Sequence, residues 1–220
     1  MKKSIYIAIT GLDGTGKTTL QRNLIGYMTD RQRKVIGVHS PHDKYLLSLL
    51  DVSGGGSIHG DIHTDRMIFA LDNRILSTRI KAWKEEYDVI IAQRCPLDSL
   101  VHANVVNYSL AELQDLNRFE ELEMPDIMIH MNADPQIAYN RIKNDPEADK
   151  YETLEYIQKQ AESTKWGYEE TIKGTNKYFL SFQKCHNIYV DTSNLSTDET
   201  FEVVLKKLAE EVSFQELFGG

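Results

Sequence analysis

The sequence has few cysteines and no long apolar run. Cys95 and Cys185 are the two cysteines, they stand far apart, and no CxxC pattern is present. Such usage fits a reducing cytosol and argues against a disulfide framework or a zinc ribbon. The longest apolar stretches, such as Ile5 to Ile9 and Val89 to Ala92, have the length of a strand. We therefore expect no membrane span and no signal peptide, and we expect a cytoplasmic protein.

The chain also lacks an excess of positive charge. It has 25 Lys and Arg against 33 Asp and Glu, which gives a formal net charge of −8 at pH 7. An acidic protein gains no general electrostatic help in binding a phosphate backbone. The composition therefore argues against a long DNA or RNA footprint, although a local basic groove is compatible with it.

Apolar and amphipathic segments alternate along the 220 residues, a length that suits one large domain with a full core. The predicted strands are Ser4–Thr10, Val35–His39, Tyr87–Ala92, Asp126–Met131 and Asn187–Val190. The predicted helices are Lys17–Asp30, Tyr45–Leu50, Thr64–Trp83, Leu110–Glu123, Asp134–Lys143, Tyr151–Ile172 and Thr197–Val212. Because the strands are apolar throughout and helices separate them, the order predicts an α/β three-layer sandwich with a five-stranded parallel sheet flanked by helices.

A glycine loop lies between the first predicted strand and the first predicted helix. Its sequence from Gly11 to Thr18, GLDGTGKT, satisfies G-x-x-x-x-G-K-[ST] in the strand–loop–helix context that phosphate binding needs. Glycines let the backbone aim N–H groups at phosphate oxygens, and the helix N-terminus adds positive potential. Lys17 is assigned to the β- and γ-phosphates of a purine nucleoside triphosphate and the Thr18 hydroxyl to Mg²⁺. The predicted nucleotide-binding residues here are Gly11, Asp13, Gly14, Thr15, Gly16, Lys17, Thr18 and Thr19.

A phosphate loop alone does not separate a GTPase, a motor and a kinase. No N-K-x-D guanine motif is present, and the predicted strand Tyr87–Ala92 is followed by Gln93-Arg94 rather than by a metal-binding aspartate. These absences favour a kinase with a P-loop NTPase-type fold.

Six segments, in this order, resemble the thymidylate kinase family of nucleoside monophosphate kinases over most of the chain: GLDGTGKTT, MIFALDNR, VIIAQRCPLDS, PDIMIHMNADPQIAYNRI, DKYE and YVDTS. The resemblance implies one kinase domain over residues 1–220, with a lid at about 142–151. It further implies ATP as the phosphate donor, Mg²⁺, a (deoxy)nucleoside monophosphate acceptor similar to dTMP, a role in nucleotide biosynthesis, and a homodimer formed through the long helices.

The resemblance also implies roles for single residues. Arg94 would grip the acceptor phosphate with its planar, charged fork, and Arg74 would meet the same phosphate or the base. Asp13 would hold the acceptor sugar, and Arg141 with Lys143 would close over the phosphates. The predicted catalytic residues are Lys17, Gln93, Arg94 and Arg141; the predicted acceptor-binding residues are Asp13, Phe69, Arg74, Arg94, Asp98 and His102; and Thr192 lies in the segment expected near the adenine.

Three positions depart from the family pattern. Gln93 stands where the family has an acid that organises the metal, and Asp98 is the candidate to replace that acid. Gly14 stands where some members carry an arginine, so the compensating charge is expected from the lid. Phe69 precedes Arg74 by five residues, whereas the family spacing from the stacking aromatic to the helix arginine is four.

Three other functions fit parts of the pattern. A deoxynucleoside kinase shares the architecture, but it needs a base to take the 5′-hydroxyl proton, and Gln93 does not supply one. A kinase acting on a modified base in DNA is disfavoured by the net charge of −8. A nucleotide-binding regulator without turnover would explain Gln93 as a sign of lost catalysis. The sequence favours the monophosphate kinase over these three.

Overall fold

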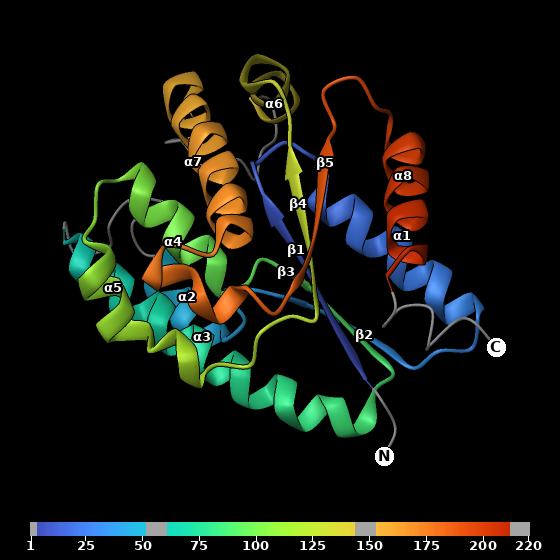
Figure 1. Cartoon of the computed structure of the whole chain (residues 1–220), viewed down its shortest axis with the longest axis horizontal. Helices are drawn as coiled ribbons and strands as arrows, with labels where there is room; N and C mark the ends of the chain where they lie inside the picture. Colours follow the sequence, from blue (N-terminus) through green and yellow to red (C-terminus); the bar gives the residue numbers. More distant parts are fainter. Residues whose placement is uncertain (1–3, 52–60, 144–152, 212–220) are drawn as a thin grey trace.

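A computed structural model describes residues 4–51, 61–143 and 153–211 of the chain. In these ranges the strands are β1 (Ile5–Gly11), β2 (Val35–His39), β3 (Val89–Gln93), β4 (Ile127–Asn132) and β5 (His186–Asp191). They form one sheet in the order β2-β3-β1-β4-β5, and every neighbouring pair is parallel (Figure 1). The predicted five-stranded parallel sheet is confirmed.

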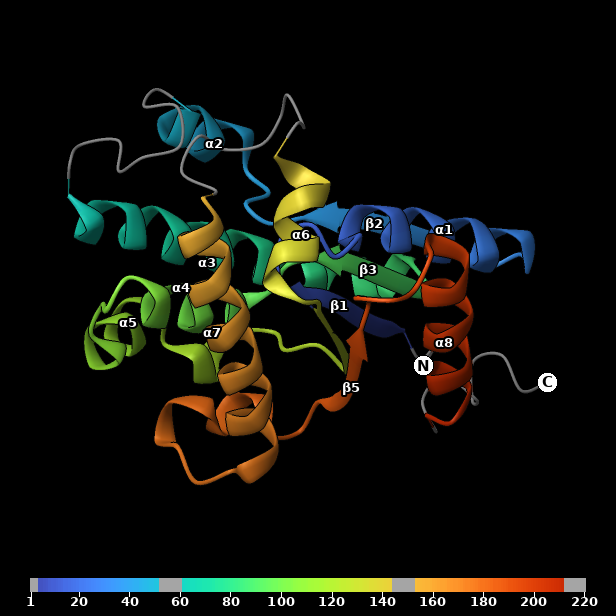
Figure 2. The same cartoon turned by 90° about the horizontal axis from the view of Figure 1, so that it is seen from above.

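Both faces of the sheet are covered by helices, which explains why its central strands are apolar at successive positions. The helices are α1 (Lys17–Asp30), α2 (Lys44–Asp51), α3 (Ile62–Glu86), α4 (Pro96–Val105), α5 (Leu110–Asn117), α6 (Pro135–Ile142), α7 (Leu154–Lys173) and α8 (Thr197–Ala209). Helices α1 and α8 lie on one face of the sheet, and α3, α4 and α7 lie on the other (Figures 1 and 2). The three layers predicted from the sequence are therefore present.

Strand β1 shows how the two cores are built. Tyr6 and Ala8 pack with residues of the α3–α4 side, whereas Ile5, Ile7 and Ile9 pack with residues of the α1–α8 side. This alternation follows from the two-residue side-chain period of a strand. All seven residues of β1 are buried, so the strand holds the glycine loop that follows it on a rigid support.

The predicted helix Leu110–Glu123 is wrong in its second half. Helix α5 ends at Asn117, because Arg118 adopts a left-handed conformation with φ of 48°, and a 3₁₀ turn, η1 (Phe119–Glu121), follows. The Phe119 side chain is thereby fully buried against Phe182. Helix α4 and a second 3₁₀ segment, η2 (Lys177–Phe182), were not predicted.

The predicted lid at about 142–151, which includes Lys150, falls almost wholly outside the described residues. No helix in the described ranges combines the length and apolarity that crossing a membrane requires.

The topology brings the predicted site residues to one edge of the sheet. The strands are parallel, so the carboxyl ends of β1, β3 and β5 lie at the same edge. That edge carries the glycine loop after β1, Arg94 after β3 and Thr192 after β5. The carboxyl edge of an open α/β sheet is where ligands bind in such folds.

Candidate active site

The segment from Gly11 to Gly16 has a backbone that requires glycine. Gly11 and Gly14 have φ values of 124° and 79°, which L side chains rarely adopt. A Cβ on Gly14 would lie 2.4 Å from the backbone oxygen of Ala138 in α6. An arginine at this position, as in some relatives by resemblance, is therefore incompatible with the observed contact between the loop and α6.

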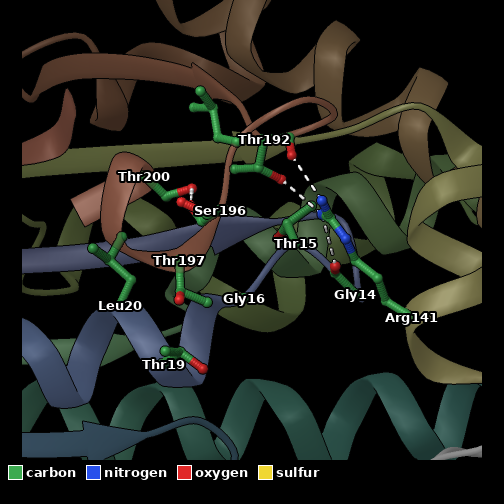
Figure 3. Close-up of a pocket in the computed structure, with 11 residues that line it drawn as sticks. Gly14, Thr15, Gly16, Thr19, Leu20, Arg141, Thr192, Ser196, Thr197 and Thr200 are labelled. Atoms are coloured by element: carbon green, nitrogen blue, oxygen red, sulfur yellow. Dashed lines mark hydrogen bonds between the residues drawn. The ribbon is translucent and has the colours of Figure 1, made fainter. Parts of the chain in front are cut away.

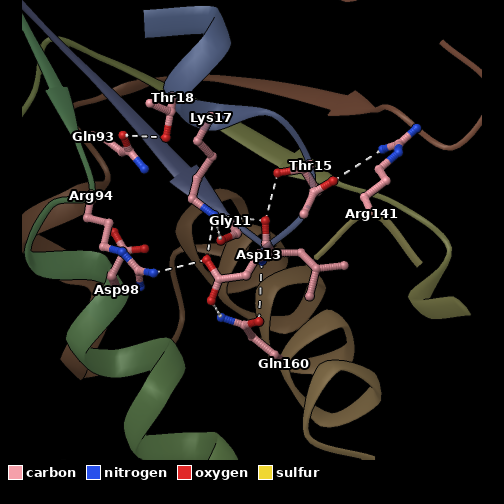
Figure 4. Close-up of polar contacts among 12 residues, drawn as sticks. Gly11, Asp13, Thr15, Lys17, Thr18, Gln93, Arg94, Asp98, Arg141 and Gln160 are labelled. Atoms are coloured by element: carbon pink, nitrogen blue, oxygen red, sulfur yellow. Dashed lines mark hydrogen bonds and ion pairs between the residues drawn. The ribbon is translucent and has the colours of Figure 1, made fainter. Parts of the chain in front are cut away.

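Lys17 is buried under the loop, with 4% of its surface exposed. Its Nζ donates hydrogen bonds to the backbone oxygens of Gly11 at 3.0 Å and Leu12 at 2.8 Å, and to Asp13 Oδ1 at 2.8 Å (Figure 4). These contacts fix the ammonium group against the loop whose N–H groups would hold phosphates. The position agrees with the role predicted for Lys17.

Asp13 joins three elements of the site. Its Oδ1 accepts from Arg94 Nη2 at 2.9 Å as well as from Lys17, and its Oδ2 accepts from Gln160 Nε2 at 2.9 Å (Figure 4). Gln160 Oε1 in turn accepts from the Asp13 backbone N–H at 3.3 Å. Burial by itself raises the pKa of Asp13, but Arg94, Lys17 and these hydrogen bonds hold that pKa well below its usual range. Asp13 is therefore a carboxylate that positions two cations.

Arg94 follows β3 in a left-handed backbone conformation, with φ of 69°. Such a conformation in a non-glycine residue costs about 1 kcal/mol or more and is concentrated at functional sites. Its backbone N–H donates to the Ile9 backbone oxygen at 2.8 Å, which fixes the turn against β1. The carboxylate of Asp13 raises the pKa of Arg94 above its ordinary value, so the guanidinium is always charged.

Gln93 lies beside the residue predicted to bind the metal. The Thr18 hydroxyl donates to Gln93 Oε1 at 3.1 Å (Figure 4), and Gln93 is buried. Asp98, the candidate replacement for the missing acid, instead caps α4: its Oδ2 accepts from the Cys95 backbone N–H at 2.8 Å. Within the described ranges, no group of three or more His, Cys, Asp or Glu residues is placed to hold a metal.

The oxygens of Thr18 and Gln93 nevertheless fit Mg²⁺. This ion takes oxygen ligands, keeps several waters, and is commonly held through one or two protein groups together with substrate phosphates. A hydroxyl and a neighbouring amide oxygen at the phosphate loop match that requirement.

The larger of two cavities at the site lies between the loop and the start of α8. Its volume is about 260 Å³ (Figure 3). The lining residues are Gly14, Thr15, Gly16, Thr19, Leu20, Arg141, Thr192, Leu195, Ser196, Thr197 and Thr200. We call it the donor cavity, because it adjoins the loop and contains the predicted residues Thr19 and Thr192.

Arg141 lies at the edge of the donor cavity. Its Nη2 donates to the backbone oxygen of Thr192 at 2.9 Å, and its Nη1 is 3.2 Å from Thr192 Oγ1 and 3.4 Å from the backbone oxygen of Gly14 (Figure 3). Arg141 thus ties α6 to the loops after β1 and β5. Lys143, its predicted companion, donates to Asn140 Oδ1 at 2.9 Å and does not line this cavity.

The smaller cavity, which we call the acceptor pocket, lies among α3, the end of β3 and α4. Its volume is about 60 Å³. The lining residues are Ser40, Arg66, Phe69, Asn73, Arg94, Cys95, Asp98, Ser99 and His102. Phe69, Arg94, Asp98 and His102 were predicted acceptor-site residues, and the structure brings these four together.

Arg74, which was predicted to meet the acceptor phosphate or the base, does not line this pocket. Its Nη1 contacts Glu121 Oε2 at 2.6 Å and its Nη2 donates to the Asn117 backbone oxygen at 3.1 Å, so it faces α5. Asn73, four residues after Phe69, lines the pocket instead. Residues four apart share one face of a helix whereas residues five apart do not, so the spacing already marked the discrepancy.

Arg66 and Gln160 were missed by sequence reasoning. Arg66 shares a helix face with Phe69, three residues away, and this spacing was the available signal. Gln160 carried no such signal, because it reaches Asp13 from a helix 147 residues later in the chain.

Comparisons with known proteins agree on one family. Residues 9–190 match the family described as thymidylate kinase. A probable thymidylate kinase 1 of Saccharolobus solfataricus is 26% identical over 204 residues, covering 91% of this chain and 94% of the relative. A thymidylate kinase of Caldicellulosiruptor saccharolyticus is 26% identical over 211 residues, covering 93% and 95%. A probable thymidylate kinase of Pyrobaculum aerophilum is 28% identical over 163 residues, covering 70% and 78%.

Proposed function

The chain belongs to the thymidylate kinase family, and from that premise we propose that it is a nucleoside monophosphate kinase that transfers the γ-phosphate of ATP to dTMP. The supporting observation is that one carboxylate oxygen, Asp13 Oδ1, contacts both Lys17 at the glycine loop and Arg94 in the acceptor pocket. The cation for the donor phosphate and the cation for the acceptor phosphate are thereby held next to each other.

On the donor side, ATP lies with its phosphates in the glycine loop and its nucleoside toward the donor cavity. Lys17 stabilises the charge that develops on the transferred phosphoryl group. The Thr18 hydroxyl and Gln93 Oε1, which are hydrogen-bonded to each other, are the oxygens that would hold Mg²⁺. The ion supplies further charge neutralisation on the phosphates. Arg141 fixes the loop after β5 beside the nucleotide.

On the acceptor side, Arg94 binds the phosphate of dTMP through its fork of N–H donors. Asp13 positions that guanidinium, and we infer that it also binds the acceptor sugar. Phe69 offers an aromatic face to the base within the same pocket. Transfer between two bound phosphates relies on positioning and charge stabilisation, so the reaction does not need a strong base.

The rival deoxynucleoside kinase would need such a base. Asp13 is engaged by two cations, and its lowered pKa makes it a poor proton acceptor. Asp98 caps α4 through one oxygen. The surroundings of these two carboxylates favour a phosphorylated acceptor over a free hydroxyl.

The deciding experiment measures ADP formation from ATP and Mg²⁺ with dTMP, dUMP, dCMP, dGMP, dAMP, thymidine and single-stranded DNA as acceptors. We expect dTMP to give the highest kcat/KM and thymidine and DNA to give none. Turnover with thymidine or DNA but not with dTMP would refute the proposal. No turnover with any acceptor, when ATP binds, would support the regulator instead.

We also propose a homodimer formed through α3. Met67 and Leu71 of this helix are 51% and 50% exposed, which supports such an interface. Met67→Glu should then shift the species seen by light scattering from a dimer to a monomer.

We further propose a reducing, cytoplasmic setting. Cys95 and Cys185 are both free and buried, which supports it.

A further inference from the structure

Helix α7 carries a buried glutamine on the face that it packs against the glycine loop. Ile157 and Ala161 of this face are buried in one cluster with Leu12 of the loop. Gln160 comes three residues after Ile157, so it shares their side of the helix, and it has 6% of its surface exposed. Burying an amide costs free energy unless its hydrogen bonds are made. The partners of Gln160 therefore indicate why a glutamine stands at this position.

Both ends of the Gln160 amide contact Asp13 (Figure 4). Nε2 donates to Asp13 Oδ2 at 2.9 Å, and Oε1 accepts from the Asp13 backbone N–H at 3.3 Å. Although burial opposes it, Arg94 and Lys17 keep the pKa of Asp13 well below its usual range, so Asp13 is a carboxylate. The amide must then turn its N–H toward that carboxylate and its oxygen toward the backbone N–H. The two contacts fix the backbone and the side chain of Asp13 together.

The effect of Gln160 extends to the two cations of the site through a rigid group. A carboxylate is planar, so a bond that holds Oδ2 of Asp13 also sets the direction of Oδ1. Oδ1 contacts Lys17 Nζ at 2.8 Å and Arg94 Nη2 at 2.9 Å. The orientation of Asp13 therefore determines where both cations lie.

The neutral charge of Gln160 suits this position. Lys17 and Arg94 are cations and Asp13 is an anion, so the three together keep a net positive charge for the substrate phosphates. A neutral amide holds Asp13 without changing that balance. A glutamate at the same place would cancel the net charge and repel the Asp13 carboxylate.

We propose that Gln160 is a positioning residue for phosphoryl transfer. It holds Asp13 in the orientation that places Lys17 at the donor phosphate, and the same orientation places Arg94 at the acceptor phosphate. Catalysis of phosphoryl transfer relies on positioning and charge stabilisation, so both cations must be in place at once. Loss of Gln160 should then lower kcat for every acceptor. The inference rests on the proposed function and adds to it a residue that acts through Asp13.

The first test is Gln160→Glu, which keeps the shape of the side chain and makes its hydrogen bonding depend on pH. At pH 8.5 the new carboxylate is ionised and repels Asp13. At pH 6 it should share a proton with Asp13, and a protonated carboxyl donates and accepts as the amide does. We expect kcat with dTMP to be about 100-fold below the wild type at pH 8.5 and within about tenfold at pH 6.

The matched control is Gln158→Glu. Gln158 lies on the same helix at an exposed position, so this variant makes the same charge change away from Asp13. Its kcat relative to the wild type should stay near one at both pH values. A ratio for Gln160→Glu that is the same at pH 6 and pH 8.5 would overturn the inference, because a merely structural defect has no reason to recover on protonation.

The second test is Gln160→Met, which keeps the length of the side chain and removes both hydrogen bonds. By itself it should lower kcat by about 100-fold at either pH. In the Asp13→Asn background it should cost less than about threefold, because Gln160 acts through the carboxylate that is already lost. Additive effects of the two substitutions would overturn the inference. This cycle also decides the matter if Gln160→Glu fails to fold.

Calorimetric binding of dTMP separates this inference from the proposed function. A wild type that binds dTMP without turnover would refute the kinase proposal. The Kd of Gln160→Glu for dTMP, relative to the wild type, should still be higher at pH 8.5 than at pH 6, and a pH-independent ratio would overturn the role of Gln160. A wild type that neither binds nor phosphorylates dTMP would overturn both.

Discussion

The donor cavity and the acceptor pocket share the glycine loop region but are built differently. The donor cavity has a volume of about 260 Å³ and is lined mostly by glycines, threonines and leucines. Its charged lining residue, Arg141, is already bonded to Thr192 and Gly14. The acceptor pocket has a volume of about 60 Å³ and is lined by two arginines, an aspartate and a histidine.

This difference in lining and volume indicates different functions for the donor cavity and the acceptor pocket. A roomy cavity of hydroxyls and backbone fits a nucleotide by shape, whereas a narrow pocket with buried charges discriminates by polar complementarity. We therefore expect substitutions at the loop to abolish chemistry for every acceptor. Substitutions in the acceptor pocket should change which acceptor is used, and substitutions outside both should change neither.

The largest effect is expected from Lys17→Ala. This change removes the cation that meets the transferred phosphoryl group, so kcat should fall by about 10³-fold or more with every acceptor. The measurement is ADP formation under saturating substrates, with circular dichroism to establish that the fold is retained. Turnover within tenfold of the wild type would show that Lys17 does not serve the phosphate.

The second-largest effect is expected from Arg94→Ala, which should lower kcat/KM for dTMP by about 10²-fold. The acceptor phosphate loses a charge-assisted fork, while the donor cavity is untouched, so the Kd for ATP should change little. Steady-state kinetics with dTMP and ATP varied separately distinguish the two constants. If the binding of ATP and of dTMP weakened equally, the donor cavity and the acceptor pocket would not be independent, since Arg94 also contacts Asp13.

Acidification should lower the free energy of unfolding, because His102 is buried in its neutral form in the acceptor pocket. His102 has a pKa of about 3 in the fold, whereas the ordinary pKa of histidine is about 6.5, so the unfolded chain binds a proton first as the pH falls below about 6.5. The free energy of unfolding should therefore decrease between pH 6.5 and 5, by at most about 2 kcal/mol from this group. Urea titrations at pH 7 and 5 should show a smaller decrease for His102→Gln, and identical decreases would contradict the assignment.

Gln93→Asp should lower the Mg²⁺ concentration for half-maximal rate by several-fold. The variant places a carboxylate beside Thr18, where the wild type has a neutral amide, and a carboxylate binds Mg²⁺ more strongly. The Mg²⁺ concentration for half-maximal rate should fall, whatever the effect of the shorter side chain on kcat. Superimposable Mg²⁺ profiles for the two proteins would place Gln93 outside the metal environment.

The smallest effect is expected from Arg74→Met. Arg74 pairs with Glu121 at a partly exposed site, and exposed pairs contribute about 0–1 kcal/mol. Values of kcat/KM for dTMP and for dCMP should remain within twofold of the wild type. A larger loss confined to dTMP would place Arg74 in the acceptor site, as the family resemblance implied.

The sequence by itself determined the parallel sheet and the glycine loop, and it placed the residues proposed to bind phosphate. These features depend on short-range pattern: a run of buried β-branched residues, then glycines that permit positive φ, then Lys17 and Thr18 at the start of a helix. Gln93 and Arg94 were also found this way, because they directly follow a buried strand. Each of these assignments needs no knowledge of distant segments.

The tertiary structure decided which side chains of the long helices enter the site. On α3, a difference of one residue rotates a side chain by about 100°, so Asn73 lines the acceptor pocket while Arg74 pairs with Glu121 on α5. Gln160 reaches Asp13 from α7, and Arg66 is held by His102 from α4. These contacts join residues far apart in the chain, and no local pattern fixes how two helices are rotated against each other. The glycine loop and its position beside Arg94 were therefore predictable from the sequence, whereas the lining of the acceptor pocket depended on the packing of α3 and α4.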